Sequence, residues 1–144
     1  MKFSSAAIFV IMLISSASAL SFDGGPSNPG EQAVMNVMSS KSGFTVFALR
    51  ASAYEASDVC GLRPHAWGMM AGSAATRELD KQVTAAIAPF PDKAALRAYY
   101  ANTSRLIMTG LISKWAKEGI GCQKAKDFLA TNDALYVSAN TIAP

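Results

Sequence analysis

Residues 44–61 read FTVFALRASAYEASDVCG and carry the clearest helical pattern of the chain. Apolar side chains recur there at alternating intervals of three and four residues, the spacing of one helix face. This face consists of Val46, Leu49, Ala53, Ala56 and Cys60, and a second stripe beside it consists of Phe47, Ala51 and Tyr54. Gly61 follows as a C-terminal stop. We therefore predict a helix over 44–60 that presents Cys60 to the core, where a disulfide would be buried and structural.

The second cysteine, Cys122, follows a glycine-rich turn at 119–121 and starts a short predicted helix over 122–130. The inner positions of this helix are expected to be Cys122, Ala125 and Leu129. An even cysteine count without CxxC spacing favours one intramolecular disulfide in an oxidising compartment. Closing a loop of about 60 residues removes roughly 4 kcal/mol of unfolded-state entropy. We therefore expect a Cys60–Cys122 bridge that ties the second helix to the last.

Three other segments have the pattern of a helix: 29–39, 64–88 and 92–118. The middle one contains Gly68 and Gly72, each of which costs about 1 kcal/mol relative to alanine in a helix interior, so we expect it to be interrupted. No stretch alternates apolar and polar residues with the period of a strand. The predicted fold class is therefore all-α, a small irregular bundle of four to five helices with one disulfide.

The first residues have the pattern of a secretory signal peptide. Lys2 is followed by a nine-residue apolar run at 6–14, and Ala17 and Ala19 are the small residues that a signal peptidase inspects. Nine residues at about 1.5 Å each cannot cross a hydrocarbon core of roughly 30 Å. The expected organisation is a signal peptide at 1–19, a flexible lead-in at 20–30, a helical domain at 31–130 and a C-terminal tail at 131–144. We expect a periplasmic or secreted protein.

Charge and motifs argue against several functional classes. Without Lys2 the chain has 12 basic and 10 acidic side chains, too small a surplus for a nucleic-acid binder. The sequence contains no CxxCH, paired CxxC, HExxH, Walker or EF-hand pattern and no later apolar run of membrane-spanning length. His65 is the single histidine, and oxidised cysteines cannot serve as nucleophiles. We expect no cofactor, and the sequence favours a protein that is not an enzyme.

The segment His65-Ala66-Trp67-Gly68-Met69-Met70 is the strongest local candidate for ligand binding. A helical turn would place His65 and Met69 on one face with Trp67 nearby, and Met70 follows directly. Imidazole and thioether groups suit a soft ion such as copper(I). Methionine and tryptophan are also common core residues, so simple packing is the ordinary interpretation of this cluster. A small-ligand or copper carrier is therefore an alternative function.

Charged side chains supply two further alternatives. Glu55 and Asp58 share a helix face, Glu118 ends the long helix, and a glycosidase needs two carboxyl groups about 5 to 9 Å apart. A small cell-wall-active enzyme using Glu55 or Glu118 is one hypothesis, and plain solvation of these acids is the ordinary interpretation. Basic residues gather along the long helix and after its end: Arg97, Arg105, Lys114, Lys117, Lys124 and Lys126. They could contact an anionic surface or simply be solvated.

In size, signal and helix content the chain resembles two-cysteine helical proteins of the bacterial periplasm, among them immunity proteins that neutralise cell-wall-degrading toxins. This resemblance implies a stapled helical fold and transfers no individual residues. It also implies a partner protein in the envelope, such as a toxin or another envelope component. The leading hypothesis is therefore an exported, non-enzymatic helical interaction protein that binds such a partner.

Overall fold

The computed structural model describes residues 25–131, which form five α-helices and one π-helical turn and contain no strand. The elements in chain order are α2 (Pro29–Met38), α3 (Lys41–Tyr54), η1 (Glu55–Val59), α4 (His65–Ile87), α5 (Lys93–Glu118) and α6 (Gly121–Thr131). The predicted all-α fold with four to five helices and one disulfide is confirmed. The expected signal peptide, residues 20–24 of the lead-in and residues 132–144 of the tail lie outside the described residues.

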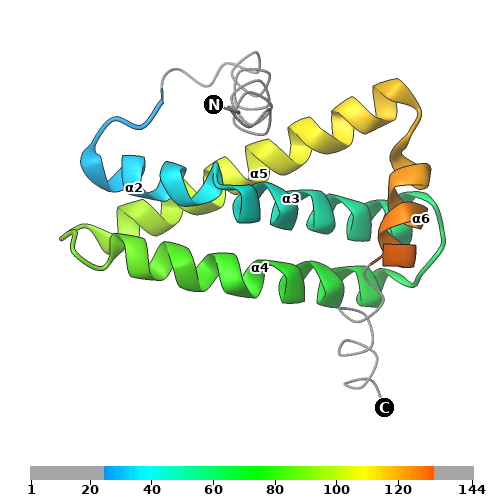
Figure 1. The fold of residues 1–144 in the computed structure, drawn as a ribbon, viewed down its shortest axis with the longest axis horizontal. Coiled ribbons are helices and arrows are strands. Elements are labelled where there is room, and N and C mark those ends of the chain that lie inside the picture. The colour runs from blue at the N-terminus through cyan, green and yellow to red at the C-terminus, as the bar shows by residue number, and fades with distance from the viewer. Residues whose placement is uncertain (1–24, 132–144) are drawn as a thin grey trace, which may run out of the picture.

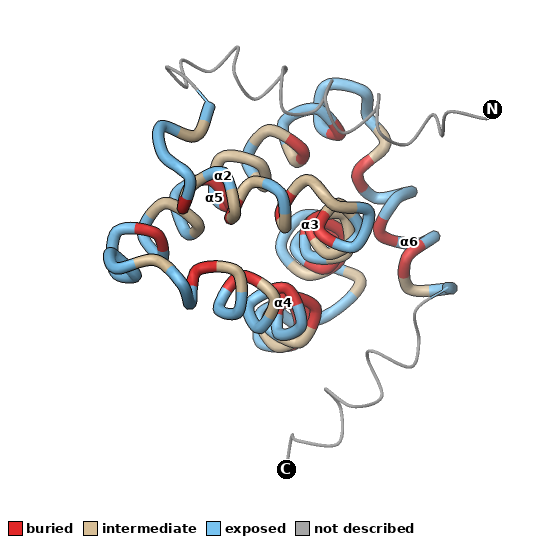
Figure 2. The backbone as a smooth tube through the Cα atoms, turned by 60° about the vertical axis from the view of Figure 1, so that its left-hand side comes forward, coloured by how far each residue is buried: buried red, intermediate tan, exposed pale blue. Residues whose placement is uncertain are grey.

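Helix α3 is the central element of the bundle. It runs antiparallel to α4, and α5 crosses the pair obliquely while the short α6 sits at the end where α3 continues into η1 (Figure 1). Every other helix contacts α3. Figure 2 shows the buried positions turned toward the inside of this arrangement and the exposed positions along the outer sides of the helices. Within residues 25–131, no helix combines the length and apolar character required to cross a membrane.

The helix boundaries follow from local capping. Asn28 caps α2 by accepting a hydrogen bond from the Glu31 backbone N–H at 2.9 Å, as its sequence position predicts. Asp92 caps α5 in the same way through the backbone N–H of Ala95 at 3.2 Å. Gly119 ends α5 in the left-handed conformation at φ 64°, which glycine adopts without steric cost. These caps explain why the predicted and observed ends of α2 and α5 differ by only one residue.

The core is divided among three apolar clusters. The largest lies between α2, α3, α4 and α5 and contains Val34, Met38, Phe47, Leu79, Val83, Ile87 and Leu96. A second joins α3 to α5 through Ala51, Leu111 and Trp115. The third holds α6 against α3, η1 and α4 through Ala53, Ala56, Trp67, Ala71, Ala125 and Phe128. Because this third cluster is built largely from alanines, α3 and α6 approach each other closely at the η1 end.

The expected interruption of the third helical segment is wrong, because α4 runs unbroken from His65 to Ile87. A Cβ on Gly68 would lie 2.6 Å from the Ser57 Cβ and 3.3 Å from the Ala53 carbonyl oxygen, and closer still to the Ser57 hydroxyl. Gly68 is therefore required by the close approach of α4 to η1. The packing gained by this approach offsets the weak helix propensity of glycine.

Helix α3 ends in a widened turn. The predicted helix over 44–60 is continuous, but its last turn is the π-helix η1, in which the Cys60 backbone N–H donates to the Glu55 carbonyl at 2.8 Å, five residues back. The Leu62 backbone N–H similarly donates to the Ala56 carbonyl at 2.8 Å. Single π-helical turns are rare and occur frequently at functional sites. The turn η1 is therefore the first candidate for a functional site.

Candidate functional site

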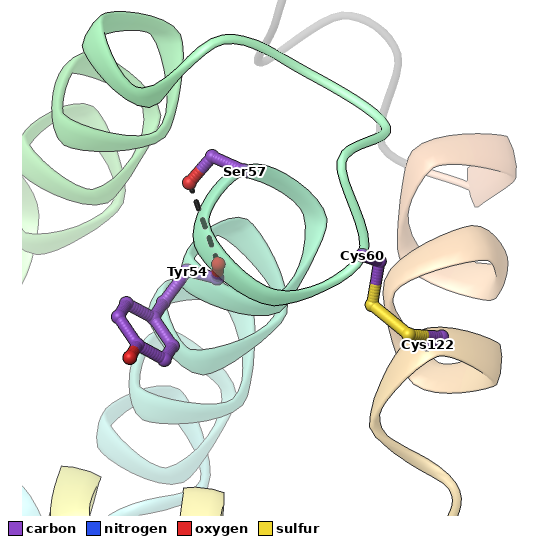
Figure 3. The surroundings of a disulfide bond; sticks show 4 residues. All are labelled: Tyr54, Ser57, Cys60 and Cys122. Atoms are coloured by element: carbon purple, nitrogen blue, oxygen red, sulfur yellow. Dashed lines mark hydrogen bonds between the residues drawn. A yellow bond between two sulfur atoms is a disulfide. The ribbon is translucent and has the colours of Figure 1, made fainter.

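The disulfide at the end of η1 joins Cys60 to Cys122, with an S–S distance of 2.04 Å and a Cα–Cα distance of 5.6 Å (Figure 3). The predicted pairing is therefore confirmed. The expected burial is wrong, because Cys122 is exposed and Cys60 only half-buried. The buried face of α6 consists of Gly121, Ala125 and Phe128, which moves Cys122 from the inside of the helix to its edge. The bridge consequently lies at the edge of α6, with one of its two cysteines exposed.

Glu55, at the first position of η1, is only 3 % exposed. Its carboxyl group lies against the Cα of Gly121, where an added Cβ would be 2.7 Å from Oε2 and 2.9 Å from Oε1. The described residues place no lysine, arginine or histidine within ion-pair distance of this group. Burial therefore raises the pKa of the Glu55 carboxyl above its ordinary 4.5. The ordinary interpretation of Glu55 as a solvated surface acid is wrong.

The raised pKa of Glu55 gives a test by pH. A carboxyl whose pKa is higher in the folded state contributes stability that is complete below pH 4.5 and is lost as the pH rises through the folded-state pKa. We expect Glu55→Gln to remove this loss, so that the stability of the variant relative to the wild type increases with pH. Urea unfolding between pH 4 and 8 measures the difference, with Glu78→Gln on exposed α4 surface as the control. Parallel curves for the wild type and Glu55→Gln would contradict the assignment.

Asp58 and His65 form a surface pair across the loop between η1 and α4. The His65 Nδ1 and Asp58 Oδ1 atoms are 2.5 Å apart, and the two side chains are 69 % and 24 % exposed. In neutral imidazole this hydrogen bond places the proton on Nδ1 and leaves Nε2 as the nitrogen with a free lone pair. The pair thus presents one basic nitrogen to solvent. Glu55 and Asp58 do not face a common site, since Glu55 lies against Gly121.

Three contacts define how α3 and η1 lie against α4: Arg50 with Gly72, Ser57 with Gly68, and Asp58 with His65. Residue numbers rise along one partner as they fall along the other, which is the register of an antiparallel pair. Tyr54 lies between Arg50 and Asp58 along α3 and η1, and Met69 lies between His65 and Gly72 along α4. Both residues are exposed, so their side chains lie on the outer side of the segments that make these contacts.

Three large apolar side chains are exposed between the end of α3 and the first turns of α4. Tyr54 is 41 %, Val59 57 % and Met69 63 % exposed, and among the described residues these are the exposed large hydrophobic side chains. Figure 3 shows the Tyr54 ring directed away from the disulfide, on the side of α3 opposite Cys60. We call Tyr54, Asp58, Val59, His65 and Met69 the seam edge. All five belong to the 16-residue stretch 54–69, in which the chain turns from the end of α3 through η1 into α4.

The remaining members of the His65–Met70 cluster do not share this edge. Trp67 is only 7 % exposed and packs in the cluster beneath α6, where the Arg63 guanidinium carbon lies 5.8 Å from the ring centroid. Met70 is half-buried. The structure therefore brings His65 together with Asp58 on the exposed side and turns Trp67 toward the core.

The charged residues weighed as alternatives are dispersed on the surface. Glu118 is exposed and forms a weak ion pair with Lys114 at 4.0 Å. The other basic candidates are also exposed: Arg97, Arg105, Lys117, Lys124 and Lys126. Exposed ion pairs of this kind contribute at most about 1 kcal/mol to stability. Nothing in their geometry distinguishes these residues from an ordinary solvated surface.

Sequence reasoning missed Tyr54 and Val59, and it assigned Tyr54 to an apolar stripe. The close contact of α4 with α3 and η1 could have been located from the sequence. Gly68 and Gly72 are spaced i,i+4 on α4, and small residues at that spacing allow two helices to approach closely. Comparison with protein-family models, with curated proteins and with solved structures finds no match. The site therefore rests on the geometry of this chain.

Proposed function

We propose that this is an exported, non-enzymatic protein that binds a partner protein in the cell envelope through the seam edge. The observation that carries the proposal is that Tyr54, Val59 and Met69, the exposed large hydrophobic residues of the described chain, all fall within residues 54–69, where α3 continues through η1 into α4. Clustered apolar exposure rimmed by polar groups is typical of interaction sites, and tyrosine and methionine are enriched in interfaces. Asp58 and His65 provide the polar rim.

Rigidity supports the same proposal. The edge is held by the close contact of Ser57 with Gly68 and by the disulfide at the end of η1. A surface that is already fixed before binding loses less conformational entropy when it meets its partner. The two cysteines lie at disulfide distance, as expected in an oxidising compartment. Export to the periplasm, and a toxin or an envelope component as the partner, form part of this proposal.

Site-specific photo-crosslinking in living cells tests the proposed surface. We expect a photoreactive phenylalanine analogue at position 54 or 69 to give one discrete adduct of the same partner, because both positions lie on the seam edge. The same analogue at Arg97, an exposed position of α5, is the matched control and should give no such adduct. Mass spectrometry of the adducts then identifies the partner.

Once the partner is identified, Tyr54→Asp and Met69→Asp should each weaken binding by about tenfold or more, the effect of losing a residue at the centre of an interface. Isothermal titration with the purified partner measures this change, and Arg97→Asp serves as the control. Unchanged affinity of both seam variants, or equal crosslinking from all three positions, would contradict the proposal.

A further inference from the structure

We propose that His65 and Met69 form a surface site for a soft monovalent ion, copper(I) or its analogue silver(I), with Asp58 as the residue that orients the imidazole. Both ligands lie on α4 at i,i+4, where side chains of successive turns are neighbours. Both are exposed, the His65 side chain by 69 % and Met69 by 63 %. Both ligand residues are therefore exposed on the solvent side of α4.

Asp58 provides the feature that separates this pair from two unrelated surface residues. Histidine ligands of metals almost always donate their second ring N–H to a carboxylate, a carbonyl or water, which fixes the tautomer and the ring orientation. In the neutral imidazole, His65 Nδ1–H donates to Asp58 Oδ1 at 2.5 Å, which leaves the lone pair of Nε2 for an ion. Asp58 is brought to this position by η1 and the loop that follows it. The carboxylate that orients the His65 imidazole is thus already in place.

The donor set selects the class of ion. Thioether and imidazole groups favour copper(I) over calcium, magnesium or manganese, which require oxygen ligands. Among residues 25–131, no three His, Cys, Asp or Glu side chains lie close enough to hold one ion, so the described chain does not offer a zinc or calcium cage. Cys60 and Cys122 are joined to each other and provide no thiolate. A two-ligand nitrogen–sulfur site for a soft ion is the chemistry that remains.

The test uses the purified, disulfide-bonded protein, silver(I) as the probe and NMR of methionine methyl groups as the readout. Trp67 packs into the core, so the methyl group of Met69 reports the site more directly than tryptophan fluorescence. We expect one equivalent of silver(I) to shift the Met69 methyl and the His65 ring resonances together. The methyl resonance of half-buried Met70 should remain in place.

Substitutions then separate the ligands from the orienting residue. Met69→Leu and His65→Asn should each abolish one-equivalent binding, and Asp58→Asn should keep it but lower the affinity by about 10- to 100-fold, the usual effect of removing such a partner. Met70→Leu is the matched control and should bind like the wild type. Circular dichroism establishes that each variant is folded. Absence of a Met69 shift, equal shifts of all methionine resonances, or wild-type affinity in Met69→Leu would overturn the proposal.

Discussion

Gly68→Ala is expected to destabilise the protein by about 1 to 3 kcal/mol, the typical cost of overpacking a tight contact. In most exposed helix interiors this substitution stabilises by about 1 kcal/mol, because alanine is the better helix former. At position 68 the new methyl group would lie 2.6 Å from the Ser57 Cβ, well inside contact distance. The neighbouring backbone of α3 leaves little room to relax, since the Ala53 carbonyl oxygen is 3.3 Å away. The sign of the effect is therefore reversed.

Two glycines of the same chain provide matched controls. A Cβ on Gly72, one turn further along α4, would meet only Arg50 Cγ at 3.6 Å, an ordinary contact. A Cβ on Gly110 in α5 would meet nothing within 4 Å. Gly72→Ala and Gly110→Ala should accordingly leave stability unchanged or raise it by about 1 kcal/mol or less. Urea unfolding of the three variants measures the contrast.

A second substitution tests the mechanism of the Gly68 effect. Ser57→Gly removes the two Ser57 atoms that the new methyl group would meet, the nearest of its contacts. Combining it with Gly68→Ala should therefore recover stability relative to the sum of the single changes. A double-mutant cycle gives this coupling as about 0.5 to 3 kcal/mol for residues in contact. Additive effects, or a stabilising Gly68→Ala, would show that α4 and η1 do not approach as closely as the structure indicates.

Much of the fold could be predicted because its determinants are local. The spacing of apolar residues predicted the helices, and Asn28 and Gly119 predicted helix boundaries through capping chemistry. The pairing of Cys60 with Cys122 followed from two cysteines without CxxC spacing and from the expected export to an oxidising compartment. None of these inferences required knowledge of how one helix packs on another.

The features that define the site depend on that packing. Cys122 was expected inside α6, but docking against α3 and η1 buries Ala125 and Phe128 and leaves the cysteine at the edge. The role of Gly68 depends on Ser57 of another element, and the burial of Glu55 depends on Gly121, 66 positions later in the sequence. The π-helical turn has no simple periodicity that the sequence could reveal. Sequence reasoning therefore found the His65 and Met69 pair but not the surface on which it lies.

Reduction of the Cys60–Cys122 bridge is expected to lower the free energy of unfolding by about 4 kcal/mol, because the denatured chain recovers the entropy that a loop of about 60 residues had lost. Since Cys122 is exposed, a thiol reductant should reach the bridge in the folded protein without denaturant. Small domains have a total stability of about 5 to 15 kcal/mol, so the reduced protein should still fold at low temperature but melt far below the oxidised form. Circular dichroism melts with and without reductant measure the difference.

Unfolding of the reduced protein should begin at α6. This helix is held by the bridge and by the buried residues Ala125 and Phe128, and it is the last described element of the chain. Hydrogen exchange in the reduced protein is therefore expected to accelerate first in α6, whereas α3 and α4 keep the protection of the larger core. The double variant Cys60→Ser with Cys122→Ser should reproduce the reduced protein and be insensitive to reductant. Identical melting of the wild type with and without reductant would show that the bridge adds no stability in solution. Uniform hydrogen exchange across all helices of the reduced protein would show that α6 does not open on its own.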